Sequence, residues 1–206
     1  MKRSILSIFL LLGLLWAPVT VWAEQKLLFL GDSLTAGLGV DPAQAYPSLV
    51  EQELRNQGFK VQVINAGVSG STSASGPARL KWYLQAKPDL LFLALGANDG
   101  LRGLDINEMK ANLSAVVEAA QKAGVPVVIA GLRMPPNYGK EYTQAFHQAF
   151  FEVAERYQLP HLPKLLAGVA GRPPLNQADG IHPNAEGHRI IAAQVAQFIA
   201  PLLKKK

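Results

Sequence analysis

A serine, a histidine and an aspartate of this sequence have the residue types and the setting that acyl transfer requires. Ser33 follows the apolar run of residues 27–30 in a Gly-Asp-Ser-Leu motif, and His182 lies near the C-terminal end in Asp-Gly-Ile-His-Pro. A serine nucleophile needs a base that accepts its proton and an acid that orients the base. Asp179 precedes His182 by three residues, and Gly180 permits a tight turn between them. The pattern predicts Ser33 as nucleophile, His182 as general base and Asp179 as its partner.

Two further positions could stabilise the negative oxygen that forms during such a reaction. Gly70 offers a backbone N–H with no side chain to obstruct a substrate, and Asn98 offers a side-chain amide. Each follows an apolar run that we expect to be a strand, as does Ser33. With the N–H of Ser33 they would supply three donors, which predicts an oxyanion hole made of Ser33, Gly70 and Asn98.

The sequence lacks the motifs of several other chemistries. Residues 31–37 have neither the GxGxxG spacing of a dinucleotide loop nor the lysine of a phosphate-binding loop. The G-x-S-x-G elbow of α/β-hydrolases is absent, and no histidine–acid cluster has catalytic zinc spacing. The chain contains no cysteine, which excludes disulfides and cysteine-based metal sites. We therefore expect a reaction that uses neither a metal nor a cofactor.

Apolar and amphipathic segments alternate along the chain after residue 24. The predicted strands are residues 26–30, 61–64, 89–95, 125–130 and 159–162. The predicted helices are residues 42–57, 77–85, 106–122, 138–157 and 183–203. This alternation predicts an α/β domain over residues 24–206, with a parallel sheet covered by helices on both faces. Ligands of such sheets bind at the carboxyl ends of the strands, where the candidate residues lie.

Four motifs together resemble the SGNH, or GDSL, hydrolase family. They are GDSL at residues 31–34, Gly70 within VSG, GAND at residues 96–99 and DGIHP at residues 179–183. Their order matches the family throughout. The segments at residues 98–103, 135–139 and 179–184 further resemble its bacterial periplasmic thioesterase, lysophospholipase and arylesterase branch. Ala97 departs from that branch, which often has glycine there; this affects only the local backbone beside Asn98.

The resemblance implies a fold, an activity and a site. The fold would be a flavodoxin-like three-layer α/β/α sandwich with a five-stranded parallel sheet. The activity would be that of a serine esterase and thioesterase, which cleaves aryl esters, acyl thioesters or lysophospholipids through an acyl-enzyme. Ser33, His182 and Asp179 would be the catalytic triad, and no cofactor would take part.

Residues near the predicted site could bind the substrate. The candidates, each on a loop after a predicted strand, are Leu101, Arg102, Leu104, Met134 and Pro135. The apolar ones could line an acyl groove or be ordinary loop hydrophobes. Arg102 could meet an acidic headgroup or be solvated. Asp32, beside the nucleophile, is interpreted as a cap of loop amides.

Two alternative functions are compatible with the same residues. A carbohydrate O-deacetylase would use the same nucleophile, base and oxyanion donors on small acetyl esters. A non-catalytic small-molecule-binding module could use the same strand ends, although a binder has no use for a base oriented by an acid.

The N-terminal segment has the organisation of a secretory signal peptide. Residues 1–3 are Met-Lys-Arg, residues 5–16 are apolar, and small residues precede a predicted cut after Ala23. The apolar core is short for a spanning helix, which needs about 20 residues, and Pro18 interrupts it. We expect residues 1–23 to be removed, leaving a periplasmic or secreted protein without a stable membrane anchor.

The charge of the chain favours a small-molecule partner. The formal net charge is +5 and falls to +3 when the signal peptide takes Lys2 and Arg3 with it. No basic helix face or aromatic-interleaved basic patch indicates nucleic-acid binding. We expect a monomer that acts on a small acyl ester or thioester.

Overall fold

Five parallel strands form one sheet in the computed structural model, which describes residues 24–204. The strands lie in the order β2-β1-β3-β4-β5. Their bounds are β1 Gln25–Gly31, β2 Val61–Gly67, β3 Leu90–Ala94, β4 Val127–Ala130 and β5 His161–Leu162. The chain runs outward from β1 to β2 and then crosses to β3 on the other side of β1. The carboxyl ends of β1 and its neighbours are therefore a topological switch point, the usual ligand site of such sheets.

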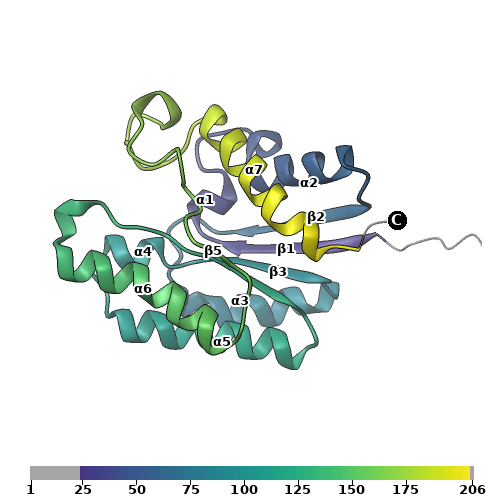
Figure 1. The fold of residues 1–206 in the computed structure, drawn as a ribbon, viewed down its shortest axis with the longest axis horizontal. Helices are drawn as coiled ribbons and strands as arrows, with labels where there is room; N and C mark the ends of the chain where they lie inside the picture. Colours follow the sequence, from purple (N-terminus) through teal and green to yellow (C-terminus); the bar gives the residue numbers. More distant parts are fainter. Residues whose placement is uncertain (1–23, 205–206) are drawn as a thin grey trace, which may run out of the picture.

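Helices cover both faces of the sheet and complete a three-layer sandwich, which confirms the expected fold class (Figure 1). One outer layer contains α1 Ser33–Ala36, α2 Tyr46–Asn56 and α7 Ala185–Ile199. The other contains α3 Gly76–Tyr83, α4 Ala97–Leu101, α5 Ile106–Lys122 and α6 Lys140–Arg156. Short 3-10 helices span Pro42–Gln44, Ser73–Ser75, Leu84–Ala86, Pro136–Tyr138, Pro173–Leu175 and Ala200–Leu202.

Local backbone chemistry shortens three of the predicted helices. The predicted helix at residues 42–57 is a 3-10 turn followed by α2, because Ala45 is extended between them. Helix α6 begins only after Gly139, whose φ of 84° lies outside the helical region. Helix α7 begins after Asn184, whose side chain accepts hydrogen bonds from the N–H groups of Glu186 and Gly187.

The centre of the core is built from aromatic rings of the two central strands. Phe29 of β1 and Phe92 of β3 stack with ring centroids 4.9 Å apart, and Tyr46 of α2 meets both edge-on. All three side chains are buried. Strands β1 and β3 consist almost entirely of apolar residues because helices cover both of their faces. The rings therefore fix β1, which leads into Ser33, against β3, which leads into Asn98.

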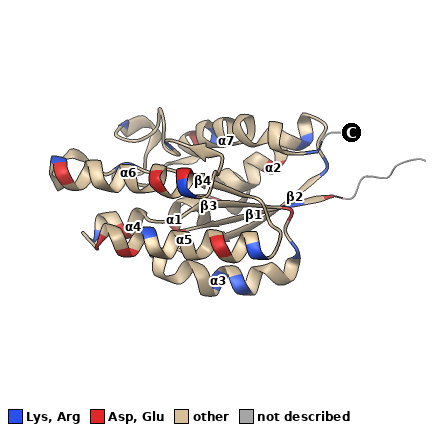
Figure 2. Cartoon of the chain, turned by 60° about the horizontal axis from the view of Figure 1, so that its bottom comes forward, with Lys and Arg blue, Asp and Glu red and all other residues tan. Residues whose placement is uncertain are grey.

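Charged residues lie mainly on the outer helices and loops, and the strands are free of charge along most of their length (Figure 2). Within residues 24–204, none of the helices combines the length and the apolar character that crossing a bilayer would need.

Strand register brings the candidate site together at one edge of the sheet. Gly31 at the end of β1 pairs with Gly67 of β2 and with Ala94 of β3. The three loops that follow these residues therefore leave the sheet side by side. They carry Ser33, Gly70 and Asn98, which explains how residues far apart in sequence share one location.

We expect Phe92→Ala to lower the free energy of unfolding by about 3–5 kcal/mol, because it removes a buried ring and leaves a cavity. The measurement is urea unfolding at neutral pH. Trp82→Ala is the matched control: this ring is 65% exposed, so its removal should change stability by no more than about 0.5 kcal/mol. Equal losses in the two variants would contradict the packing described here.

Candidate active site

The side chains of Ser33, His182 and Asp179 form a continuous hydrogen-bonded chain. Nε2 of His182 lies 2.9 Å from Oγ of Ser33, and Nδ1 lies 2.7 Å from Oδ2 of Asp179. A carboxylate only accepts hydrogen bonds, so Nδ1 carries the imidazole proton and Nε2 is left to accept the proton of the serine hydroxyl. This is the tautomer that a general base needs in order to activate Ser33.

The turn that carries Asp179 holds the histidine in place. Oδ1 of Asp179 accepts hydrogen bonds from the backbone N–H groups of Ile181 and His182, each at 3.0 Å. Gly180 makes the turn possible with a φ of 75°, a value that side-chain-bearing residues rarely adopt. The bonds from the His182 backbone and side chain, followed by that from Ile181, lower the pKa of Asp179 to about 2. Asp179 is therefore an anion throughout the physiological range.

A short helical turn presents the nucleophile. Ser33 is the first residue of α1 and is largely buried, and Asp32 caps this helix by accepting the N–H of Leu34 at 3.0 Å. Thr35 of the same turn shares a hydrogen bond of 2.9 Å with the hydroxyl of Tyr46. A Cβ atom on Gly31 would lie only 1.9 Å from Oγ1 of Thr35, so the turn can approach the end of β1 only if residue 31 is glycine.

Two loops that carry the candidate oxyanion donors are tied to each other. Nδ2 of Asn98 donates to the carbonyl of Ser71, the residue after Gly70, at 3.0 Å. The carboxylate of Asp99 accepts the N–H of Ser73 at 2.8 Å and its hydroxyl at 2.5 Å. The amide nitrogen of Asn98 carries a second hydrogen, which can serve a bound ligand. Asp99 thus orders the loop after β2 as well as its own.

Arg79 of α3 is a positioning residue that sequence reasoning missed. Its guanidinium donates to the carbonyl of Gly31 at 2.9 Å, to the carbonyl of Ala66 and to Oγ of Ser71 at 3.0 Å. It therefore joins the carboxyl ends of β1 and β2 to the loop of Gly70. Burial lowers the pKa of Arg79, although an arginine remains charged at any physiological pH. No motif marks this residue, because its partners are mostly backbone carbonyls.

Asp32 carries an uncompensated carboxylate oxygen directly beside the nucleophile. The side chain is fully buried, and Oδ2 has no hydrogen-bond partner among the residues that the structure describes. Burial raises the pKa of Asp32 to about 6, and the Leu34 N–H and the charges of His182 and Arg79 only partly offset that effect. The capping role expected from the sequence is confirmed. The raised pKa of Asp32 could not be predicted from the sequence, because it depends on burial in the fold.

The predicted substrate-binding residues lie together on the loops after β3 and β4. Sδ of Met134 packs so closely on Gly100 that an added Cβ there would lie 2.5 Å from it. The hydroxyl of Tyr138 donates to the carbonyl of Leu101, and that of Tyr142 to the carbonyl of Leu104, each at 3.1 Å. These contacts join the segment after β3 to the segment after β4 and to α6, and Pro135 follows Met134 as an exposed residue.

Arg102 makes a contact that the sequence did not predict. Its guanidinium donates to the carbonyl of Gly70 at 2.8 Å, across the mouth of the site. It therefore braces the loop whose N–H is a candidate oxyanion donor. The side chain is exposed, so its other donors can still reach a ligand.

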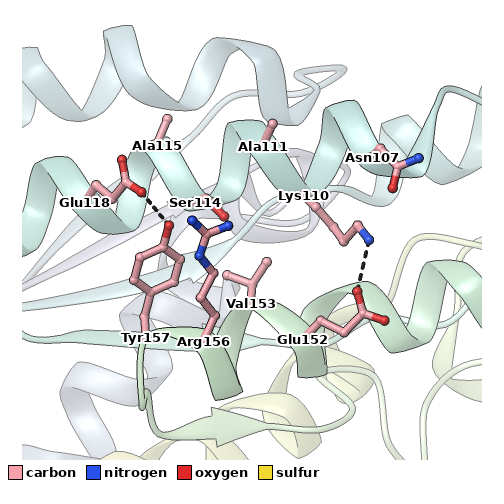
Figure 3. A pocket seen from close by; sticks show the side chains of 10 residues that line it. All are labelled: Asn107, Lys110, Ala111, Ser114, Ala115, Glu118, Glu152, Val153, Arg156 and Tyr157. Atoms are coloured by element: carbon pink, nitrogen blue, oxygen red, sulfur yellow. Dashed lines mark hydrogen bonds and ion pairs between the residues drawn. The ribbon is translucent and has the colours of Figure 1, made fainter.

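An open surface cleft of about 460 Å³ lies elsewhere, between α5 and α6 (Figure 3). Most of its polar groups are paired with one another: Lys110 with Glu152 at 3.0 Å, and the Tyr157 hydroxyl with Glu118. None of the residues that line it belongs to the triad or the candidate oxyanion hole. The cleft therefore offers none of the candidate catalytic side chains, which lie together at the carboxyl ends of the strands.

The structure is a three-layer sandwich with a parallel sheet. A hydrogen-bonded serine, histidine and aspartate lie at the carboxyl ends of its strands, which is the architecture of a serine hydrolase. Comparison with known families defines it further. Residues 29–190 match the GDSL-like lipase/acylhydrolase family, and the chain belongs to that family. It is therefore a carboxylic ester hydrolase.

Several well-described proteins are similar over most of their length. Esterase TesA of Pseudomonas aeruginosa is 39% identical over 182 residues, which cover 88% of this chain and 90% of that one. An arylesterase of Vibrio mimicus is 42% identical over 176 residues, covering 85% and 88%. Thioesterase 1/protease 1/lysophospholipase L1 of Escherichia coli K12 is 35% identical, covering 88% and 86%. The crystal structure of TesA matches with a TM-score of 0.84, covering 87% of this chain and all of TesA.

We expect Asp32→Asn to stabilise the protein above about pH 6 and not at pH 4. The pKa of Asp32 is about 6 in the fold against about 4 in the unfolded chain, so its charge destabilises the fold above pH 6 and this effect disappears as the pH falls to 4. Asparagine keeps the oxygen that caps Leu34. The free energy of unfolding in urea should rise by roughly 2–3 kcal/mol at pH 8 and change little at pH 4. A gain of equal size at both pH values would refute this account.

Proposed function

We propose that this protein hydrolyses carboxylic esters and thioesters with Ser33 as nucleophile, His182 as general base and Asp179 as the residue that orients the base. The observation that carries the proposal is the pair of hydrogen bonds at 2.9 Å and 2.7 Å that link the three side chains. Distances of this size are those of a nucleophile and base poised for proton transfer.

In the first half of the reaction, Oγ of Ser33 bonds to the substrate carbonyl carbon while its proton moves to Nε2 of His182. The carbonyl oxygen becomes an oxyanion that the N–H groups of Ser33 and Gly70 and the amide of Asn98 stabilise. The imidazolium is stabilised by the Asp179 carboxylate. His182 then gives its proton to the leaving oxygen or sulfur as that bond breaks, and an acyl-enzyme on Ser33 remains.

In the second half, a water molecule gives a proton to Nε2 of His182 and attacks the acyl carbon. The same three donors hold the new oxyanion. Its collapse breaks the bond to Oγ of Ser33, which takes the proton back from His182, and the carboxylic acid leaves. Every proton transfer is accounted for by His182, so the proposed steps call on no metal or cofactor.

The apolar wall formed by Leu101, Leu104 and Met134 favours acyl chains longer than acetyl. Aryl esters, acyl thioesters and lysophospholipids, the substrate classes that the names of the relatives indicate, are the proposed substrates. We propose that the enzyme acts in the periplasm or outside the cell as a monomer. That location rests on the signal peptide predicted at residues 1–23, which lie outside the described residues.

A fluorophosphonate probe followed by peptide mapping tests the proposal. We expect one labelled serine, Ser33, and no labelling of Ser33→Ala. His182→Ala should slow labelling by at least a hundredfold, because the hydroxyl loses the base that activates it. Ser114→Ala, which changes a serine of the distant cleft, serves as a control with an intact triad, and its circular dichroism verifies the fold. Labelling at any other serine would remove Ser33 from the role of nucleophile.

We expect Asn98→Ala to lower kcat by about 10²–10³ on p-nitrophenyl butanoate and to leave KM within about threefold, because the amide acts mainly on the oxyanion. Asn98 also binds Ser71, so thermal unfolding must show that the loop remains folded. Asn107→Ala, an asparagine that lines the distant cleft, is the control and should retain wild-type kcat. A rise in KM with unchanged kcat would assign Asn98 to substrate binding instead.

A further inference from the structure

Large apolar side chains exposed to solvent gather around the mouth of the site. Seven such side chains are exposed within residues 24–204. Four belong to loops at the carboxyl edge of the sheet: Leu38 at 45%, Val68 at 48%, Leu104 at 40% and Ile181 at 43%. Exposed apolar groups that cluster beside reactive side chains are typical of a binding surface. Leu104 belongs to the acyl wall described above, whereas Leu38 and Ile181 have no role in it.

Gln177 ties the loop of Leu38 to the loop of Ile181. Its side-chain amide donates to the carbonyl of Leu38 at 2.6 Å and to that of Pro183 at 2.9 Å. Its backbone N–H donates to the carbonyl of His182 at 2.8 Å. These bonds join the segment after the nucleophile turn to the segment that carries the general base. The two apolar residues therefore belong to one structural unit next to His182.

This unit lies in the opposite layer of the sandwich from the acyl wall. Leu38 follows α1 and Ile181 precedes α7, and both helices belong to the layer that also contains α2 (Figure 1). Leu104 follows α4 and Met134 follows β4, next to α6 in the other layer. The two sets of apolar residues thus lie in opposite layers, with the carboxyl end of the sheet between them and Ser33 directly after β1.

The chemistry of the proposed function assigns different parts of the substrate to the two sets of apolar residues. The leaving oxygen or sulfur must receive a proton from Nε2 of His182 and so must face the imidazole. The oxyanion must face Gly70 and Asn98, and the acyl chain takes the remaining direction. The group bonded to the leaving atom therefore extends past Ile181, the neighbour of His182.

We infer that Leu38 and Ile181 form a leaving-group subsite that selects alcohols, phenols or thiols with an apolar body. The inference rests on the proposed function and extends it, because it separates selection of the leaving group from selection of the acyl chain. A wall of leucine and isoleucine gains free energy from methylenes or an aryl ring and nothing from the hydroxyls of a sugar. It therefore favours alkyl and aryl esters over acetylated carbohydrates and, among the proposed substrates, over lysophospholipids, whose leaving alcohol carries a polar glycerophosphodiester.

Two pairs of esters test the inference on the full chain. Hexyl against ethyl butanoate varies only the alcohol, and ethyl octanoate against ethyl butanoate varies only the acyl chain. The measured quantities are two ratios of kcat/KM: the alcohol ratio, hexyl over ethyl butanoate, and the acyl ratio, ethyl octanoate over ethyl butanoate. A variant that merely disturbs His182 lowers kcat/KM equally for both esters of a pair and leaves both ratios unchanged. The variants are Leu38→Ser with Ile181→Ser, Leu104→Ser, and Leu202→Ser as a control of matched exposure, 44%.

We expect the Leu38→Ser, Ile181→Ser variant to lower the hexyl-to-ethyl ratio by about fifteenfold, since a buried methylene is worth about fourfold and the contribution of four half-buried ones is lost. Its acyl ratio should stay within about twofold. Leu104→Ser should show the reverse, and Leu202→Ser should change neither ratio. An unchanged alcohol ratio, or a fall in the acyl ratio, in the double variant would overturn the inference while leaving the proposed function intact. If the wild-type protein hydrolysed none of the esters, both would fail.

Discussion

The hydrogen bond between His182 and Ser33 is the interaction on which the proposed reaction depends, and it joins residues 149 positions apart. Neither partner is positioned by the other. Ser33 is fixed by the end of β1 and by the cap that Asp32 places on α1, while His182 is fixed by the Asp179 turn and by the packing of α7. The bond is therefore a consequence of the sheet and the last helix being correctly assembled, and a fault in either layer would separate the two groups.

Polar groups behind the site maintain its shape at some expense of stability. Arg79 donates to the carbonyl groups of Gly31 and Ala66 at the ends of β1 and β2, and so ties the loops of Ser33 and Gly70 to each other. Asp32 is less well compensated, since one buried oxygen has no partner and its pKa is about 6. A buried group that weakens the fold yet lies beside reacting atoms is typical of functional sites, where stability and chemistry make opposing demands.

The sequence predicted the elements that follow periodic rules and missed those that depend on tertiary contacts. The five strands and helix α5 were found because apolar runs and helical periodicity report burial directly. The break at Ala45 and the late start of α6 were missed, since each depends on a few backbone angles. The triad candidates were found because Ser33, Asp179 and His182 lie in short motifs. Arg79 and the brace from Arg102 to Gly70 could not be found, because their partners are carbonyl groups that any residue would supply.

The layer structure also explains how one reaction can accept different substrates. The proposed nucleophile and oxyanion donors follow β1 and its two neighbours, and the core holds β1 and β3 together through Phe29 and Phe92. The groups proposed to meet the rest of the substrate, such as Leu104 and Ile181, lie on loops in opposite layers of the sandwich. A substitution in one of these loops can change a binding preference without moving the reacting atoms, because no strand register depends on it. Specificity can therefore vary on either side while the same proton transfer is retained.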